Sequence, residues 1–428
     1  MKGITMRKLT AVLTVGALAL SVGACGKKNG GGDSAAANKE LVYRSSWGAD
    51  EPQGKAMKAL FDDFAKETGT KVDVKFVGRK GNDNLATEMA AGQGPDLFDT
   101  STDTIDRFAA QNLAAPLDDV LKKQVPGEGK PVSEVLSQAV RDASGTDKGL
   151  AFVPHTVIST AVWFDAAKHP VKTPKSWEDF VAYLDTAKKA GRSPLAQDGT
   201  INFYNVYWFY SALVRANGEG SMKALATDPA AWDKPEVLAA ARKVEQLARG
   251  GYFQKDFMAT KFPAAQDGWA QGKYDLNING TWLAGETKPK LPADARVTSF
   301  QLPVGGKDSV EVGTLGWGVN AKGHNPDTAK EFLAFALQKK YAQALSEGAL
   351  SIPARGDVPA PAHLAGIQKD VADAKATHRT YDGAAADQKW WNDVFLPIDD
   401  KLVSGKSDAA AFVKEGKAAT ASYLKNKS

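Results

Sequence analysis

The sequence predicts an α/β protein with open sheets whose strands are joined by crossover connections. Two observations support this prediction: short apolar runs alternate as strands do, and the segments between them carry apolar residues at helical spacing. The chain has 428 residues, which is long enough for two or more packed lobes. Open α/β sheets bind ligands at the carboxyl ends of their strands, so the loops that follow the strands are candidate sites.

The regular alternation of elements begins near residue 40. In chain order, the sequence predicts a strand at 41–44, a helix at 51–69, a strand at 70–77, and a helix, a loop and a strand within 83–99. In the first helix, apolar residues recur at helical spacing from Met57 to Phe64. We therefore expect Trp47, which follows the first strand, and the loop from Asp99 to Asp103 to lie on one edge of the sheet.

The composition is that of an ordinary globular protein, with 43% hydrophobic and 24% charged residues. The net charge of +4 falls close to zero once Lys2, Arg7 and Lys8 leave with the signal peptide predicted below. A chain so close to neutral gives no general attraction to nucleic acid or to an anionic surface. Beyond the first 24 residues, no uncharged run approaches the roughly 20 residues that a membrane span needs. The five histidines show no metal-binding spacing, and we expect no metal and no cofactor.

The N-terminal segment has the features of a lipoprotein signal peptide. Residues 1–8 are basic, residues 9–22 are uncharged, and "VGAC" resembles a bacterial lipobox that ends in Cys25, the only cysteine of the chain. The alternative is a plain secretory signal whose cysteine merely lies near the cleavage point. We expect a signal peptide at 1–24, a lipidated Cys25, and an extracytoplasmic protein anchored to the cell membrane. Residues 25–39 then form a glycine-rich tether with a reach of about 20 Å.

Five stretches farther along the chain carry recognisable patterns. They are "GPDLFDTSTDTIDRFAAQNLAAPLDD", "GLAFVPHTVISTAVWFDAAKH" followed by "KTPKSWEDFVAYLDTAKKAG", "WAQGKYDLNINGTWLAG", "GWGVNAKGHNPDTAKEFLAFAL", and "GALSIPARGDV". In this order they resemble segments of the family 1 extracellular solute-binding proteins, the maltose-binding-protein group of ABC importers. Each stretch alone is weakly specific, but together they extend the similarity over essentially all of residues 40–428.

The resemblance implies a two-lobed, periplasmic-binding-protein-like α/β fold of type II, with three hinge crossings and a ligand cleft between the lobes. Lobe 1 would take residues 40–152 and 312–350, and lobe 2 would take residues 153–311 and 351–428. The resemblance also implies a substrate-binding protein that captures a mono- or oligosaccharide, closes around it and delivers it to the permease subunits of an ABC importer. We expect a lipid-anchored monomer that binds no nucleic acid and catalyses no reaction.

Sugar sites combine hydrogen-bonding groups with a flat aromatic surface, and the chain has ten tryptophans. Trp47 and Trp317 each lie where a predicted strand gives way to small residues. Trp282 follows the strand "NING", and the resemblance assigns it the stacking platform, with a core role as the alternative. The resemblance also gives Trp208 a ligand-facing position, with a buried helix face as the alternative. Two further candidates complete the set: Asn279, within "NING", and Trp391, which points to a different side of a helix from its neighbour Trp390.

The polar candidates are fewer. By resemblance, Asp103 matches the ligand-binding carboxylate of the family, and Asp99 is its neighbour; a loop-capping pair is the alternative. Arg355 is expected to donate paired hydrogen bonds to sugar hydroxyls, and His155 lies at the first crossing, where a structural role is the alternative. Thr100 stands where maltose-binding protein has an aromatic residue, which argues against maltose itself. Because Arg355 is the only cation among these candidates, we expect a neutral saccharide.

A secreted glycoside hydrolase is the main alternative function, since it too would combine aromatic residues with two carboxylates. Such an enzyme needs these carboxyl groups about 5 to 10 Å apart across the scissile bond. The sequence contains no G-x-S-x-G and no H-E-x-x-H motif. A purely structural surface lipoprotein is a third hypothesis, but it would not need hinge-like crossings.

Overall fold

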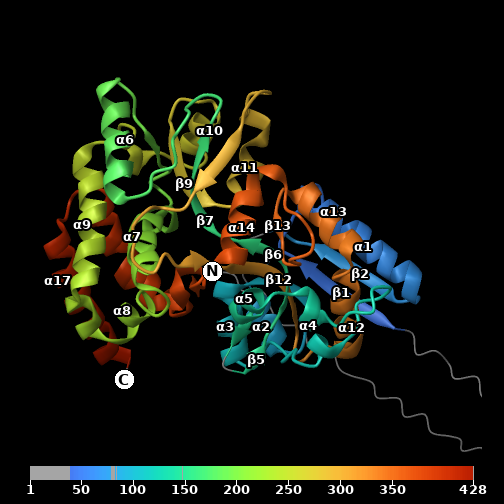
Figure 1. The fold of residues 1–428 in the computed structure, drawn as a ribbon. Helices are drawn as coiled ribbons and strands as arrows, with labels where there is room; N and C mark the ends of the chain where they lie inside the picture. The colour runs from blue at the N-terminus through green and yellow to red at the C-terminus, as the bar shows by residue number, and fades with distance from the viewer. Residues whose placement is uncertain (1–38, 79–81, 83, 147, 428) are drawn as a thin grey trace, which may run out of the picture. The chain divides into compact units, whose positions relative to one another are not determined.

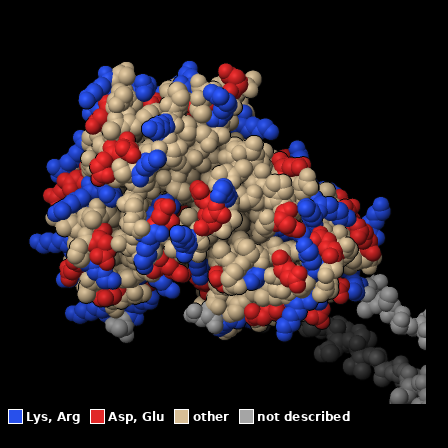
Figure 2. Space-filling model, viewed as in Figure 1, with Lys and Arg blue, Asp and Glu red and all other residues tan. Residues whose placement is uncertain are grey.

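The computed structural model describes residues 39–78, 82, 84–146 and 148–427. The predicted signal peptide, Cys25 and most of the predicted tether lie outside these residues. None of the helices in the described residues is long and apolar enough to cross a membrane. Side chains of both signs are interspersed over the face shown in Figure 2, without a broad patch of either sign, as expected for a chain that is nearly neutral.

The first three strands of the chain belong to a six-stranded sheet (Figure 1). Its order is β13–β6–β12–β3–β1–β2, and its strands are β1 Glu40–Ser45, β2 Lys71–Phe76, β3 Leu97–Ser101, β6 Val153–Ile158, β12 Gly313–Val319 and β13 Ile352–Pro353. β1 pairs in parallel with β2 and β3, whereas β12 is antiparallel to β3 and β6. Because β1 and β3 are parallel neighbours, their carboxyl ends meet at one edge, where the residues after Ser45 and the loop after Asp99 were predicted to lie.

Three helices pack together beside this sheet: α1 Pro52–Thr68, α12 Pro326–Ala336 and α13 Lys339–Ala349. The ring of Phe61 stacks on Phe332 at 4.2 Å and on Tyr43 at 4.4 Å, which joins α1 to α12 and to β1. α1 ends at Gly69, as the sequence predicted; its φ of 71° is a left-handed conformation that glycine adopts without steric cost. In Figure 1 the blue α1 lies beside the orange α13, although the two are far apart in sequence.

A smaller apolar cluster holds the carboxyl edge of β3. Phe98 of β3 meets Phe108 at 5.4 Å, and this cluster includes residues of α2 Leu85–Ala90 and α3 Thr102–Ala110. β3 passes directly into α3, so the first turn of α3 begins at the sheet edge. The short elements that follow are α4 Val132–Val135, α5 Gln138–Ala143, β4 Gly145–Thr146 and β5 Gly149–Leu150.

A four-stranded sheet, in the order β10–β7–β9–β8, forms the second core. Its strands are β7 Thr160–Asp165, β8 Leu195–Ala196, β9 Leu276–Gly280 and β10 Val297–Phe300. The helices that accompany it are α6 Trp177–Lys189, α7 Asn202–Asn217, α8 Lys223–Thr227, α9 Pro235–Gly250, α10 Ala264–Ala270, α11 Leu283–Thr287, α15 Gln388–Trp390, α16 Leu396–Val403 and α17 Ala409–Lys427. α7 is buried continuously from Tyr204 to Arg215, so it passes through the centre of this core. Figure 1 shows the green α7 between the other helices of this group, with the red α17 beside α9.

Three crossings connect the two sheets, as predicted. β6 passes into β7 with only Ser159 between them; β10 leads through β11 Val310–Glu311 into β12; and β13 leads through α14 Ala365–Asp373 into β14 Thr377–His378. β11 and β14 pair in parallel and so join the second and third crossings. Two of the predicted lobe boundaries would divide the six-stranded sheet. β6 and β13, which were assigned to lobe 2, pair within the six-stranded sheet, because the chain leaves that sheet only after Ile158 and Pro353.

The carboxylate of Glu311 ties the crossings together. The backbone N–H of Thr160, at the start of β7, donates to its Oε2 at 3.2 Å, and the hydroxyl of Thr380, just after β14, donates to its Oε1 at 2.9 Å. Glu311 itself belongs to the second crossing, so one buried side chain contacts all three. Burial raises its pKa, and these hydrogen bonds oppose that rise.

Candidate functional site

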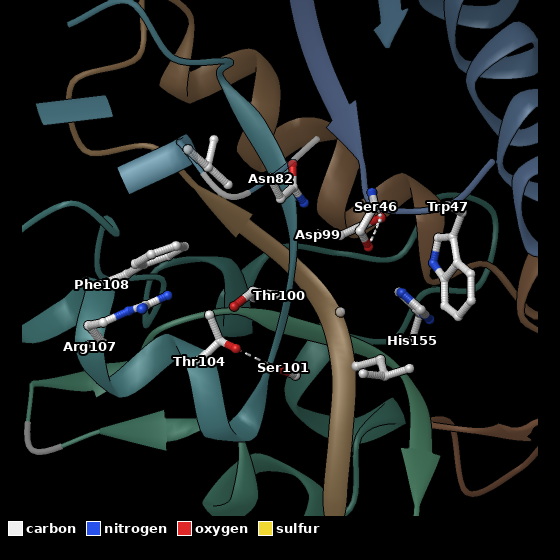
Figure 3. A pocket seen from close by; sticks show the side chains of 13 residues that line it. Ser46, Trp47, Asn82, Asp99, Thr100, Ser101, Thr104, Arg107, Phe108 and His155 are labelled. Carbon is white, nitrogen blue, oxygen red and sulfur yellow. Dashed lines mark hydrogen bonds between the residues drawn. The ribbon is translucent and has the colours of Figure 1, made fainter. Parts of the chain in front are cut away.

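A cavity of about 570 Å³ lies at the carboxyl ends of β1 and β3, beside β6 and β12 (Figure 3). It is lined by Ser46, Trp47, Asn82, Leu85, Asp99, Thr100, Ser101, Thr104, Arg107, Phe108, His155, Leu315 and Gly316. Three residues that the sequence nominated, Trp47, Asp99 and His155, therefore come together at one cavity. From the order of the first strands and helices, the sequence predicted that Trp47 and the loop from Asp99 would lie at one edge of the sheet. The cavity lies at that edge.

The carboxylate of Asp99 is engaged by the protein itself. The Tyr43 hydroxyl donates to it at 2.5 Å, the Ser45 hydroxyl at 2.8 Å, and the Ser46 backbone N–H and hydroxyl at 2.8 and 3.1 Å. A carboxylate offers about four acceptor positions, so these four bonds use most of its capacity. Burial raises the pKa of Asp99 and the four donors oppose the rise. Asp99 therefore holds the turn that carries Trp47, and it has little capacity left for a ligand.

Three buried polar atoms in the wall have no hydrogen-bond partner among the described residues: Asn82 Oδ1, Thr100 Oγ1 and Arg107 Nε. They comprise an acceptor, a hydroxyl that can donate or accept, and a charged donor. Leaving a buried polar group unpaired costs roughly 1–3 kcal/mol, so a ligand that supplies the missing partners is stabilised here. Figure 3 shows Arg107 and Trp47 on opposite sides of the cavity, with Thr100 between them.

Trp47 and His155 form the aromatic side of the cavity (Figure 3). The Nδ1 atom of His155 lies 3.0 Å from the hydroxyl of its neighbour Thr156, and its ring rests on Trp317. Burial lowers the pKa of His155 to about 3, so the ring is neutral at physiological pH. This side of the cavity therefore offers ring surface without adding a charge.

A file of aromatic rings runs through the part of the chain that carries the four-stranded sheet. We call this the aromatic file; its members are Phe262, Tyr204, Tyr207, Tyr381 and Trp391, and successive ring centroids are 6.1, 5.9, 6.0 and 4.9 Å apart. Phe262 is 43% exposed and the other four rings are buried, so the file runs from the surface inward. Tyr381 has a φ of 49°, a left-handed conformation that is uncommon outside glycine and that clusters at functional sites.

Asp103 lies at the start of α3, two residues after Ser101, which lines the cavity. It is exposed in the first turn of α3, and the Ser101 hydroxyl donates to it at 2.5 Å. Burial raises the pKa of Tyr381, and the negative charges of Glu311 and Asp103 raise it further, which places Asp103 within electrostatic reach of the file. Asp103 does not line the cavity described above.

Trp282 and Asn279 come together beside Tyr204 at the outer part of the aromatic file. Trp282 is half-buried, and its ring packs so closely over Gly280 that an added Cβ there would meet it at 2.2 Å. Asn279 is buried and donates to Gln266 at 3.3 Å. Burial, then the negative charge of Glu286, raises the pKa of the Tyr204 hydroxyl, and the polar groups of Trp282 and Asn279 oppose this rise. Gly280, the last residue of "NING", thus makes room for the indole ring.

Two predicted tryptophans lie in the core instead. The indole N–H of Trp208 donates to Gln197 at 3.0 Å, and its ring packs against Phe180 and Phe253. Trp317 is 1% exposed. Its neighbour Gly316 lines the cavity, and because side chains alternate across a strand, Trp317 points to the opposite face. Neither ring is placed to contact a ligand in the cavity.

Arg355 is likewise engaged by the protein itself. Its guanidinium is buried and bonded on every side, by Asp357 at 2.7 and 2.8 Å, by Glu128 at 2.8 and 2.9 Å, and by the Leu337 carbonyl at 2.5 Å. Arg355 does not line the cavity of about 570 Å³; it lines a separate cavity of about 280 Å³ together with His155 and Trp317. Arg355 therefore stabilises the return of the chain after β13, and the cation of the cavity is Arg107.

Sequence reasoning missed Asn82, Arg107 and two tyrosines of the aromatic file, Tyr204 and Tyr207. Arg107 follows Asp103 by four residues, so the two lie on one side of α3, and this spacing was the available signal. For α7 the sequence shows "NFYNVYWFY", in which aromatic residues occupy all sides of the helix. Such a segment does not indicate which ring faces a ligand.

A second cavity, of about 630 Å³, includes Asp106 of α3 and residues near α8. Three of the charged groups there are already held: Arg379 pairs with Asp106 at 3.1 Å, and Asp382 accepts the backbone N–H groups of Gly220 and Met222. In the described part of the chain, no group of three or more His, Cys, Asp or Glu side chains is arranged to hold a metal ion. The first cavity remains the candidate site.

Comparisons with known proteins give consistent results. The family model described as "Bacterial extracellular solute-binding protein" matches residues 48–343. A probable sugar-binding periplasmic protein of Rhizobium meliloti is 26% identical over 371 residues, covering 83% of each chain. The diacetylchitobiose-binding protein DasA of Streptomyces coelicolor is 27% identical over 369 residues, covering 81% of this chain and 82% of its own.

A solved structure shares the fold. The maltose-maltodextrin binding protein of Alicyclobacillus acidocaldarius superposes with a TM-score of 0.69 at 18% identity, covering 90% of this chain and all of its own. At this identity the likeness shows the fold alone. It confirms the predicted two-lobed, type II periplasmic-binding-protein architecture.

Proposed function

Because this chain belongs to the bacterial extracellular solute-binding proteins, we propose that it is the sugar-binding receptor of an ABC importer. It captures a mono- or oligosaccharide at the cavity beside β1 and β3 and delivers it to the membrane permease. One observation carries the proposal: a single cavity combines the ring of Trp47 with the unpaired polar atoms of Asn82, Thr100 and Arg107. Sugars present hydroxyl groups around an apolar ring face, which is the complement of this wall. The sugar-binding relatives from Rhizobium and Streptomyces support the ligand class.

The second step of the proposed function is closure of one lobe on the other. We assign the six-stranded sheet and its helices to one lobe and the four-stranded sheet and its helices to the other, with the three crossings as the hinge. Two hydrogen bonds already join α3 to the other lobe: Arg107 donates to Gln388 at 3.0 Å, and Arg379 donates to the Thr102 carbonyl at 2.8 Å. Closure about the hinge would bring the aromatic file, with Trp282 beside it, over the cavity. The closed form is then the state that the permease recognises.

The proposal includes a lipid anchor. The lipobox-like "VGAC" and the solitary Cys25 support acylation at that residue, after removal of residues 1–24. Two acyl chains hold a protein stably on a membrane, whereas one gives only marginal binding. The receptor would thus work as a monomer on the outer side of the cell membrane, tethered by the residues that follow Cys25.

The glycoside hydrolase hypothesis is not favoured by the site. Of its two candidate carboxylates, Asp99 already accepts four hydrogen bonds from the protein and holds a turn in place. Members of the matched family are binding proteins. We therefore propose binding and release of an intact sugar.

A thermal-shift screen tests this function. The purified protein is heated with monosaccharides, oligosaccharides, sugar acids, amino acids and metal salts in parallel. A ligand at about a thousand times its dissociation constant stabilises a protein by roughly 4 kcal/mol, which raises the melting temperature by several degrees. We expect a shift with saccharides, and chromatography should recover the sugar unchanged. A shift confined to amino acids or metals, or conversion of the sugar to shorter products, would contradict the proposal.

A further inference from the structure

The charge of Arg107 is not neutralised within the described part of the chain. No carboxylate there lies within ion-pair distance of its guanidinium, although Arg44, Arg355 and Arg379 pair with carboxylates at 2.7 to 3.1 Å. Within the described residues, its side-chain hydrogen bond goes to the neutral amide of Gln388, at 3.0 Å. With no described carboxylate within ion-pair distance, the guanidinium of Arg107 is available to an anionic group of a ligand in the cavity.

The guanidinium of Arg107 is nevertheless held in a fixed orientation. Its carbon lies 5.3 Å from the ring centroid of Phe108, in a cation–π contact, and the bond to Gln388 fixes its far end. The Nε atom is buried and has no partner among the described residues. A fixed guanidinium with a vacant donor recognises planar, two-oxygen groups better than a flexible lysine does.

The residues that line the cavity offer no vacant carboxylate, and Asp103, four residues before Arg107 on α3, is not among them. Asp99 is satisfied by Tyr43, Ser45 and Ser46, and His155 carries no charge at physiological pH because burial lowers its pKa to about 3. The remaining lining residues are neutral. Among the described residues that line the cavity, a cationic ligand would meet Arg107 and no vacant carboxylate, whereas an anionic ligand would meet a cation without an ion-pair partner.

We propose that Arg107 selects a saccharide that bears a carboxylate, that is, a uronic acid or an oligosaccharide containing one. This inference rests on the proposed sugar-binding function and narrows its substrate class. The carboxylate would accept the Nε–H of Arg107, while Asn82, Thr100 and Trp47 receive the hydroxyl groups and the ring face. The expectation of a neutral saccharide depended on Arg355 as the only cation, and the structure places a different arginine at the cavity.

Calorimetric titration with matched sugar pairs tests the inference. The probes are glucose with glucuronate, galactose with galacturonate, and a neutral disaccharide with digalacturonate. We expect at least one acid to bind about tenfold or more tightly than its neutral partner, which is the scale of one charge-assisted hydrogen bond. Raising the salt concentration should lower the affinity for the acid and leave the affinity for the neutral sugar nearly unchanged.

Variants distinguish the effect of the Arg107 charge on binding from the effect of its contact with Gln388 of the other lobe. Arg107→Met should reduce the affinity for the acid to that of the neutral sugar, and Arg107→Lys should retain part of the preference. Gln388→Ala is the matched control, because it removes the contact with Arg107 but leaves the cation, and it should preserve the ratio of the two affinities. The melting temperature of each variant without ligand shows whether it is folded.

The outcomes distinguish this inference from the function on which it rests. Neutral or N-acetylated sugars that bind as tightly as the acids, or more tightly, would overturn the assignment of Arg107 and leave the sugar receptor standing. An acid preference that survives in Arg107→Met would also overturn it. If no saccharide of either kind binds to the wild type, the proposed function itself fails. If Arg107→Met does not fold, Arg107→Lys and the salt dependence of the wild type still decide the question.

Discussion

The imidazole of His155 lies against the indole of Trp317, with ring centroids 4.5 Å apart and ring planes tilted by 50°. Trp317 in turn meets Phe332 of α12 at 5.5 Å, so it connects the wall of the cavity to the core beneath α12. Trp317 therefore supports a residue of the candidate site from behind. Trp317 is thus a tryptophan that stabilises the fold, and it does not line the cavity.

Replacing Trp317 should destabilise the protein more than it alters the surface of the site. Trp317→Ala leaves a cavity in a packed core, and we expect the free energy of unfolding to fall by about 3–5 kcal/mol. Phe203→Ala is the control, because that ring is 42% exposed and its loss should cost much less. Urea unfolding of both variants measures the difference. Equal losses would show that Trp317 is not a core residue.

Acidification should destabilise the fold through His155. Its pKa is lowered to about 3 by burial, against roughly 6.5 in an unfolded chain. Between these values only the unfolded chain takes up the proton. The stability contributed by the neutral ring is therefore complete above pH 6.5 and is lost as the pH falls towards 3, at about 1.4 kcal/mol per pH unit.

The matched variant for this pH dependence is His155→Gln. The slope of unfolding free energy against pH, measured between pH 5.5 and 4.5, should flatten by about 1.4 kcal/mol per pH unit in the variant. A slope should remain, because the pKa of the buried His378 is also lowered to about 3. An unchanged slope would mean that His155 is already protonated in the folded protein.

Asp399 should be a destabilising residue at neutral pH. It is buried, and neither of its carboxyl oxygens has a hydrogen-bond partner among the described residues. Its burial, and to a smaller extent the nearby charge of Asp400, raises its pKa well above the ordinary value. Above about pH 4 the unfolded chain releases this proton while the folded protein keeps it, so stability is lost as the pH rises. Asp399→Asn should therefore raise the unfolding free energy by roughly 1–3 kcal/mol at pH 7 and by much less near pH 4. A variant less stable than the wild type at pH 7 would contradict this.

Cys25 decides whether the protein is anchored. Cys25→Ser should abolish incorporation of labelled fatty acid and move the protein from the membrane fraction of cells to the soluble or secreted fraction. A nearby substitution that leaves the cysteine in place, such as Ser34→Ala, is the control. If the wild type incorporates no label, the plain secretory signal is the correct interpretation.

Much of the fold could be predicted from local patterns. The helix predicted at 51–69 is α1, ending at Gly69, and the predicted strands coincide with β1, β2 and β3 within a few residues. These elements carry their own periodicity and end signals. The lobe boundaries near β6 and β13 depend instead on which sheet a strand joins, and strand pairing is set by partners distant in sequence, such as β12.

The sequence could predict those site residues whose position follows from the order of the strands in the sheet. It could not predict those whose position depends on which face of a strand or helix carries the side chain. Trp47 and Asp99 follow neighbouring parallel strands, so their meeting could be expected. Trp317 could not be placed, because a shift of one residue along a strand exchanges the two faces, and β12 has a register irregularity between Leu315 and Gly316. Arg355 had a visible warning, since Asp357 follows it by two residues and binds it.

The most direct test of the account is a calorimetric titration of the wild type, Trp47→Ala and Trp282→Ala with the saccharide that gives the largest thermal shift. The account predicts one binding site per chain in the wild type and a loss of about 1–3 kcal/mol of binding free energy in each variant, the scale of an aromatic hot spot, with the unfolding free energy little changed. Binding that is equally tight in all three proteins, or a wild type that binds no saccharide, would contradict the claim that a sugar lies between these rings.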